Sequence, residues 1–417
     1  MRKIFVFHAL RTFSPITPFI TPFFVEKKQI KNTSFHNSVI PFFFISGFLA
    51  SLVGPLFVEH FGEKNILIWD TVLDLIFLAC FFIIPNGRVA PLVLITCMHG
   101  ASSSLSLLTK GMLYAEGGSR EKTYSTFNVI KRVSSILSSW IGQDLFFASS
   151  EYSPALILSI LSTTCCLATA FFLTGTVKKA ENTLFTTARV LTRDSFTRNY
   201  VFFSVLNIIA STIYISFAFY SANIFIERRK NTNLASNVIG RVLYYALLPF
   251  RALIFLFIKA LSLVMPIKYD PKYDEEKLIF GYVDGIAKIV SVLFSTLLTR
   301  RRYETSTLAY ISLFLVLLSI VATFLMGYTS TLISSYLCYV FGATLSNTLL
   351  MLTHSGFNKA PHLPTLLGIN LTISSGIHIG ISYFSRWKKM NANQKMYLYL
   401  GSSIVLYLVA LSVRWTS

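Results

Sequence analysis

The chain has 417 residues, of which 53% are hydrophobic and only 13% are charged, with a formal net charge of +19. Soluble proteins carry roughly a quarter charged residues. The apolar residues fall in many runs about 20 residues long, the length that crosses a bilayer core of about 30 Å. This composition excludes a soluble enzyme, a disordered chain and a disulfide scaffold, and it predicts an all-α polytopic membrane protein. Because membrane proteins collect Lys and Arg in cytoplasmic loops, we expect no nucleic-acid partner.

Twelve apolar segments predict twelve transmembrane helices, at about 4–24, 39–60, 64–85, 91–115, 128–149, 154–177, 201–226, 278–299, 307–328, 331–353, 364–385 and 395–413. The first is expected to be irregular because it carries Pro15, Pro18 and Pro22. One more apolar stretch, Val242–Met265, contains Arg251 and Lys259. These two basic residues favour an amphipathic segment in the membrane interface, with a thirteenth span as the alternative.

Two long connections organise the chain. Residues 178–200 are polar and basic, and they follow the sixth span. They divide the sequence into an N-terminal six-helix half, 1–177, and a C-terminal six-helix half, 201–417, which contains an insert at about 228–277. This organisation predicts the major facilitator fold, whose two halves enclose a central site near the bilayer midplane.

The short connections place more Lys and Arg on the side of the N-terminus, so we predict a cytoplasmic N-terminus in a plasma-membrane protein. Asn32-Thr33-Ser34 then forms a predicted glycosylation site in the first outer connection. All five cysteines lie in apolar runs without metal-binding spacing, so they are interpreted as small core residues. No pattern of nucleophile and base, phosphate loop or paired catalytic carboxylates stands out, so neither an enzyme nor a cofactor is expected.

Ionisable residues inside spans are costly, about 2.5–3.5 kcal/mol at the bilayer centre, and are therefore functional candidates. The candidates singled out on this ground are Glu59, Asp70, Asp74, Lys110, Asp144, Asp284, Lys288 and His378. Lys110 follows a run of small residues, and it either contacts an anionic substrate or extends to the cytoplasmic surface. Asp284 and Lys288 are four residues apart, so they form either a static ion pair or one that is remade during transport.

The other candidates also have two interpretations. Asp70 and Asp74 share one helix face and either bind a cation or proton or line water near the helix start. Glu59 is either a charge that locks helix ends at a cytoplasmic gate or a solvated loop charge. His378 is either a proton sensor or a hydrogen-bonded core histidine. Tyr214 and Tyr220 in the seventh span are candidates for an aromatic wall of the site, in a chain that contains 20 Tyr residues.

Several motifs together resemble the reduced folate carrier and thiamine transporter family. Pro15 to Phe24, PITPFITPFF, is similar to the first-span motif PSEPFLTPYL of that family. Lys31-Asn32-Thr33-Ser34 falls at its glycosylation site, and Pro55 to Phe61 is similar to its PVFLLTDY sequence, with Glu59 in the Asp position. Further matches occur in the same order, at Tyr124 and Arg132 in span five, Gly281-Tyr282-Val283-Asp284 in span eight and Leu367-Gly368-Ile369-Asn370 in span eleven.

The resemblance implies roles for particular positions. The charge in span four of the family falls near Lys110, which suggests an anionic substrate, and its span-eight acid falls on Asp284. The span-eleven Lys of folate carriers falls on His378. The span-seven aromatic residues fall on Tyr214, Phe219 and Tyr220, which are expected to stack on a flat heterocycle.

Two departures weaken the folate interpretation. The first-span Glu of the family is Thr17 here, and the span-ten Arg falls near Ser346. The sequence therefore predicts alternating-access transport of a vitamin, with a folate-like organic anion favoured and a counter-transported anion or a proton as coupling partner. The alternatives are a carrier of thiamine or another organic solute, and a transport-inactive membrane receptor or interaction protein. Arg132, Lys288 and Glu59 are assigned gating or structural charges.

Overall fold

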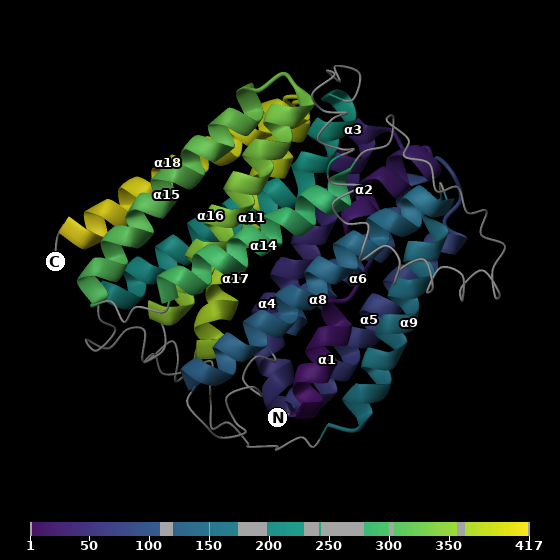
Figure 1. Ribbon diagram of the computed structural model, residues 1–417, viewed down its shortest axis with the longest axis horizontal. Helices are drawn as coiled ribbons and strands as arrows, with labels where there is room; N and C mark the ends of the chain where they lie inside the picture. Colours follow the sequence, from purple (N-terminus) through teal and green to yellow (C-terminus); the bar gives the residue numbers. More distant parts are fainter. Residues whose placement is uncertain are drawn as a thin grey trace.

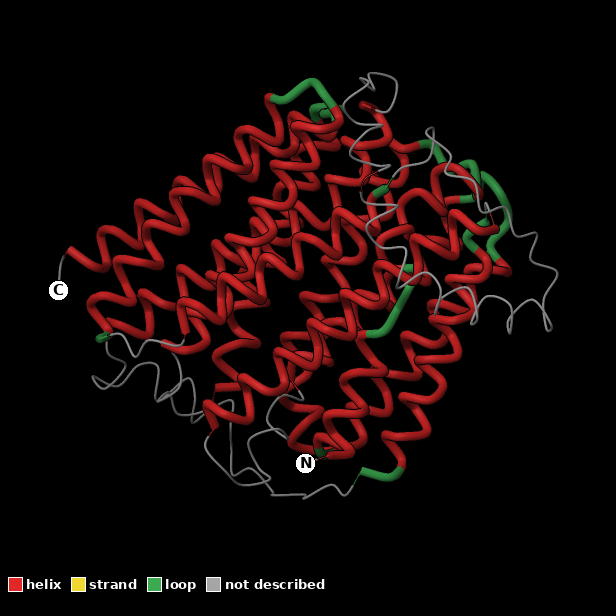
Figure 2. The backbone as a smooth tube through the Cα atoms, viewed as in Figure 1, coloured by secondary structure: helices red, strands yellow, loops and turns green. Residues whose placement is uncertain are grey.

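The computed structural model describes residues 2–108, 120–149, 151–173, 198–228, 242, 279–299, 304–356 and 363–415. Each of the twelve predicted spans coincides with helical structure in this part of the chain. Within it, nine helices are long and apolar enough to cross a membrane. Figure 2 shows long helices running through the molecule, many of them joined by short loops. The chain is therefore a multi-pass membrane protein, as its composition predicted.

The first span is broken, as its prolines predicted. Helix α1 (Arg2–Thr12) is followed by the 3-10 turn η1 (Thr17–Phe19), the short α2 (Ile20–Pro22) and the π-helical η2 (Phe23–Lys27). Pro18 and Pro22 have no amide hydrogen to donate, so each removes one hydrogen bond from a helical ladder and favours a break there. The chain consequently presents irregular backbone between α1 and η2.

The next helices are α3 (Asn32–Ser34), the π-helical η3 (Phe35–Val39), α4 (Ile40–Phe61), α5 (Glu63–Ile83), α6 (Val89–Leu108), α8 (Arg120–Ser149) and α9 (Ser153–Phe171). Between α4 and α5 the turn is only one residue long. Gly62 adopts a φ of 78° there, a conformation that residues with a Cβ rarely adopt. The C-terminal helices are α11 (Arg198–Arg228), α14 (Phe280–Thr299), α15 (Thr305–Tyr328), α16 (Leu332–Gly356), α17 (Leu363–Trp387) and α18 (Ala392–Trp415).

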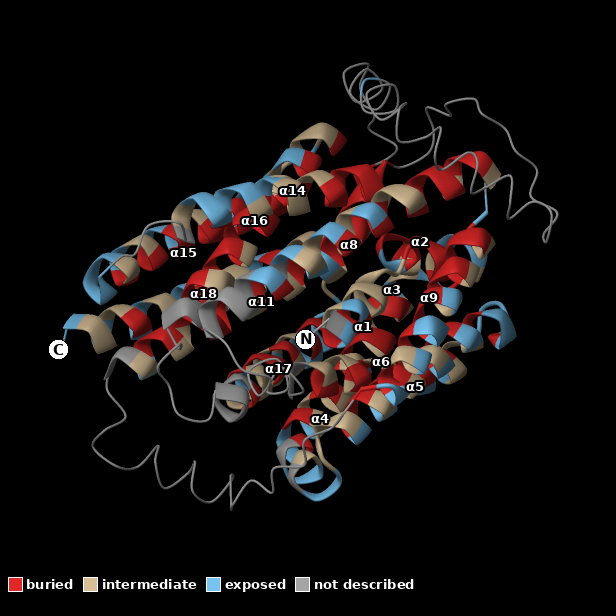
Figure 3. Ribbon diagram, turned by 60° about the horizontal axis from the view of Figure 1, so that its bottom comes forward, coloured by how far each residue is buried: buried red, intermediate tan, exposed pale blue. Residues whose placement is uncertain are grey.

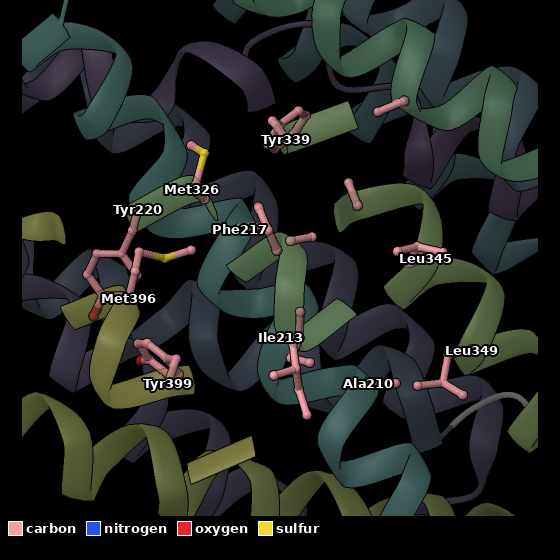
Figure 4. Close-up of a cluster of buried hydrophobic side chains, with 14 of the residues drawn as sticks. Ala210, Ile213, Phe217, Tyr220, Met326, Tyr339, Leu345, Leu349, Met396 and Tyr399 are labelled. Atoms are coloured by element: carbon pink, nitrogen blue, oxygen red, sulfur yellow. The ribbon is translucent and has the colours of Figure 1, made fainter. Parts of the chain in front are cut away.

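The apolar core falls into separate clusters that follow the order of the chain. The largest is built almost entirely from helices α11 to α18, and the next largest from helices between η1 and α9. Figure 4 shows the first cluster around α11, where Ile213 and Phe217 meet side chains of neighbouring helices. Figure 3 shows exposed positions along the outward faces of the helices. Large apolar side chains occupy many of these positions, as expected for lipid-facing surfaces: Trp69, Leu94, Phe314, Leu337, Val405 and Leu408.

Two of the contacts that join the early and late parts of the chain are α4 with α17 and α8 with α14. Figure 1 shows the purple and blue helices on one side of the molecule and most of the green and yellow helices on the other. Helix α4 packs against α17, where the hydroxyls of Ser51 and Thr372 lie 2.7 Å apart. Helix α8 packs against α14, where the Trp140 ring lies against the backbone at Gly285. These two seams position the polar residues that follow.

We expect Gly285→Ala to loosen the seam between α8 and α14. A Cβ at this position would lie 2.1 Å from Nε1 of Trp140, so the indole must move. Overpacking of this kind costs about 1–3 kcal/mol. The thermal unfolding temperature of the purified protein in detergent should fall. Gly401→Ala in α18 is the matched control, because its Cβ would meet nothing within 4 Å. Equal unfolding temperatures for the two variants would contradict the close packing of Trp140 on α14.

Candidate functional site

Asp284 is the centre of a polar network between three helices. Its side chain lies on α14 and is buried, with the residue 9% exposed. One carboxylate oxygen accepts a hydrogen bond from the Tyr339 hydroxyl of α16 at 2.7 Å. The other accepts one from the Ser139 hydroxyl of α8 at 2.7 Å and pairs with the Lys288 ammonium one turn along α14. The pair between Asp284 and Lys288 that the four-residue spacing predicted is therefore present.

Two cations border this carboxylate. The Lys288 ammonium also donates to the Ser139 hydroxyl at 2.8 Å, so it contacts both α14 and α8. Arg132 of α8 donates to the Ser291 hydroxyl of α14 at 2.5 Å. Tyr214 of α11 interacts electrostatically with both Asp284 and Arg132. The predicted residues Asp284, Lys288, Arg132 and Tyr214 are thus brought together, in a cluster that carries two cations and one carboxylate. We call this the Asp284 cluster.

A second tie between α8 and α14 lies next to the Asp284 cluster. The Tyr282 hydroxyl donates to the carboxylate of Asp144, and both side chains are buried. The side-chain oxygen of Gln143 accepts the Gly281 amide at 2.8 Å. Asp144, a candidate because of its charge inside a span, therefore holds the two helices together in this structure.

The predicted residues His378, Tyr220 and Phe219 belong to a different group, where α4, α11, α17 and α18 meet. The His378 ring stacks on Phe44 with centroids 4.4 Å apart, and its Nδ1 lies 2.8 Å from the Tyr399 hydroxyl. The ring centroids of Phe219 and Phe44 are 5.5 Å apart, and so are those of Tyr220 and Tyr399. His378 is fully buried, and its other ring nitrogen, Nε2, has no hydrogen-bond partner among the described residues.

Sequence reasoning did not single out Lys395, which stands at the first position of the twelfth predicted span, 395–413. The structure places it in α18 with the residue only 2% exposed. Its ammonium donates to the side-chain oxygen of Asn37 at 2.6 Å and lies 5.6 Å from the centre of the Tyr220 ring. The His36 ring lies against the Tyr220 ring, with centroids 5.3 Å apart. Early and late helices are therefore joined here as well, through polar and aromatic contacts.

Asp70 and Asp74 share a partner that the sequence did not reveal. Arg11 of α1 pairs with Asp70 at 2.9 Å and with Asp74 at 2.5 Å. His99 of α6 lies 3.1 Å from Asp74. The sequence did contain a signal for this contact, namely a basic residue inside the first predicted span and two acids on one helix face of the third. We call these residues the Arg11 cluster.

Several predicted positions carry no structural account. Lys110 and almost all of the predicted interfacial segment Val242–Met265 lie outside the described residues, and so does most of 178–200. Glu59 lies on α4, but its side chain is outside the described part. Thr17 begins η1 and is exposed, close to the seam between α8 and α14. Asn32 begins α3, and its side-chain oxygen is buried.

Comparisons with known proteins identify the fold. The chain matches no protein-family model and no curated protein. It is similar in structure to the nucleoside transporter NupG, with a TM-score of 0.60 and 12% identity over 99% of this chain and 97% of that one. The POT family transporter PepTSo gives a TM-score of 0.65 and 11% identity over 100% and 97% of the two chains. An auto-inhibited POT family peptide transporter gives 0.64 and 12% over 100% and 96%. The predicted major facilitator fold is confirmed, whereas the resemblance to vitamin carriers stays a prediction.

Proposed function

We propose that this protein of major facilitator fold carries a vitamin-like organic anion across the membrane by alternating access, with a folate-like compound as the favoured substrate. The observation that carries the proposal is the Asp284 cluster. Its two cations and one carboxylate join α8 to α14, one helix from each proposed half, 1–177 and 201–417. A site that bridges two moving halves is where substrate can bias their arrangement.

The chemistry of the cluster favours an anion. Lys288 and Arg132 present two positive charges, and Asp284 neutralises one of them. The planar guanidinium of Arg132 is well suited to pairing with a carboxylate of the substrate. Tyr214 and Tyr339 border the same carboxylate and offer aromatic surface for a flat ring. Lys110 would add a further positive charge, which is why the anionic substrate is favoured over the thiamine cation.

Alternating access then follows from the way the cluster is held. Every contact between α8 and α14 in it involves a hydroxyl, an ammonium or a guanidinium, groups that can exchange partners at little net cost. Binding of an anion would draw Lys288 and Arg132 away from Ser139 and Ser291. We propose that this loosens the seam and lets the two halves move. His378, Phe219 and Tyr220 would act in the second contact region instead of contacting the anion directly.

Uptake of labelled folate and labelled thiamine by cells that express the chain tests the proposed substrate. We expect uptake of folate above that of cells with empty vector. Lys110→Ala should reduce it at least about tenfold, because one charge pairing of about 1.4 kcal/mol is lost at the site. Lys64→Ala is the control, because the Lys64 ammonium caps the exposed Phe171 carbonyl at the end of α9. Uptake of thiamine but not of folate would show that the substrate is a cation and not an anion. If the folded protein takes up neither compound, the result would favour a membrane receptor.

A further inference from the structure

The Arg11 cluster is a second set of buried charges that the proposed substrate site does not use. Arg11 lies between two carboxylates, contacting Asp70 through Nη2 at 2.9 Å and Asp74 through Nη1 at 2.5 Å. Ser102 of α6 donates to Asp70 at 2.6 Å. Three helices, α1, α5 and α6, therefore contribute to one polar network inside the early part of the chain.

His99 is the member of this cluster that is open to its surroundings. Its side chain is 29% exposed, compared with 14% for Arg11, 6% for Asp74 and 0% for Asp70. Its Nδ1 lies 3.1 Å from the Asp74 oxygen that Arg11 does not contact. The ring stacks on Phe77 with centroids 4.2 Å apart, which fixes its orientation toward Asp74. A proton arriving at the cluster would therefore meet His99 first.

The charges of the cluster leave room for one proton. Two carboxylates share one guanidinium, so Arg11, Asp70 and Asp74 sum to −1, and a protonated His99 brings the sum to zero. Other groups surround the cluster, and the Cys166 thiol of α9 interacts with both acids. Lys131 of α8 and the Cys166 thiol of α9 interact with Arg11, and α4 presents the uncharged Phe43 to His99. His36 of η3 faces Tyr220, and His378 of α17 faces Tyr399.

We propose that His99, paired with Asp74, is the binding site for a proton that crosses the membrane together with the anionic substrate. The proton adds to the imidazole from one aqueous side and leaves it to the other, with no covalent change elsewhere. A contact path leads from this site toward the late helices. The His99 ring packs against the Phe43 ring with centroids 5.5 Å apart, and the Phe43 ring packs against that of Phe219 of α11 with centroids 5.0 Å apart. This inference rests on the proposed transport of an organic anion, whose charge the proton would offset.

Folate flux in proteoliposomes containing the full chain tests the proton site in two formats. In the first, net uptake is measured with the outside about two pH units more acidic than the inside, and with no gradient. In the second, exchange of labelled for unlabelled folate is measured at equal pH. We expect the gradient to accelerate net uptake by the wild type at least about fivefold, within the usual range of coupling between sites. His99→Gln should lose this acceleration and keep the exchange.

His60→Gln is the matched control, because His60 is an exposed histidine at the end of α4. It should retain both the acceleration and the exchange. If the wild type exchanges folate but the pH gradient does not accelerate its net uptake, the proposed proton site is wrong and the transport proposal stands. This comparison needs no variant. A gradient response retained in His99→Gln also overturns it. Failure of the wild type to exchange or accumulate folate overturns the proposed substrate, and the proton site with it.

Discussion

Asp284→Asn is expected to abolish folate uptake and to destabilise the protein. The change removes the only carboxylate in the Asp284 cluster and leaves the Lys288 ammonium, 18% exposed, without its ionic partner. Loss of one member of a buried ion pair costs about 3–5 kcal/mol. The Asn side chain also has a single, uncharged acceptor oxygen in place of the two carboxylate oxygens that accept hydrogen bonds from Ser139 and Tyr339. Uptake and thermal unfolding in detergent measure the two effects.

A second substitution separates the two effects of Asp284→Asn. Combining it with Lys288→Met removes the unpaired ammonium, so we expect most of the stability to return while uptake stays low. Glu304→Gln is the control for the same chemical change, because Glu304 is an exposed acid before α15. The account of the Asp284 cluster is wrong if the single variant transports at the wild-type rate, or if the double variant is less stable than the single.

Arg11→Met is expected to give the largest loss of stability in the early helices. Arg11 compensates two carboxylates at once, and Asp70 is completely buried. Without the guanidinium these acids are like charges in the helix bundle, and each broken buried pair costs about 3–5 kcal/mol. We expect poor membrane expression and a lowered unfolding temperature for the protein that is recovered. Arg386→Met, at an exposed position near the end of α17, should leave both unchanged.

The interaction between Arg11 and Asp70 can be measured by adding Asp70→Asn to Arg11→Met. The double variant should recover part of the lost stability, because one of the two uncompensated charges is gone. Additive destabilisation by the two substitutions would show that Arg11 and Asp70 do not stabilise each other. This comparison reads out stability alone, so it is independent of any substrate or proton coupling.

The helices were predictable because a membrane imposes a simple rule on sequence. A span needs about 20 apolar residues, so the predicted ranges coincide with helical structure within a few residues at most ends. The largest departure among the described helices is α8, which begins at Arg120, eight residues before the predicted start at 128. Its first turns are polar, REKTYSTFN, and hydropathy does not report a helix that continues beyond the bilayer core.

Residue spacing predicted contacts in the candidate site only where both partners lie on one helix. The pair Asp284 and Lys288 follows from a spacing of four residues, and so does the common face of Asp70 and Asp74. Partners on other helices leave no such pattern. Arg11 is 59 residues from Asp70, and Ser139 is 145 residues from Asp284. Lys395 was missed for the same reason, because its partners Asn37 and Tyr220 lie on distant parts of the chain.

Counterflow measures the central claim of folate transport by alternating access most directly. Proteoliposomes that contain the chain are loaded with unlabelled folate and diluted into a small concentration of labelled folate at equal pH. A carrier that exposes one site to either side in turn must show a transient accumulation of label, larger than in vesicles without internal folate. We predict that overshoot for the wild type and its loss in Asp284→Asn. Identical time courses for loaded and empty vesicles containing folded wild-type protein would contradict alternating-access transport of folate.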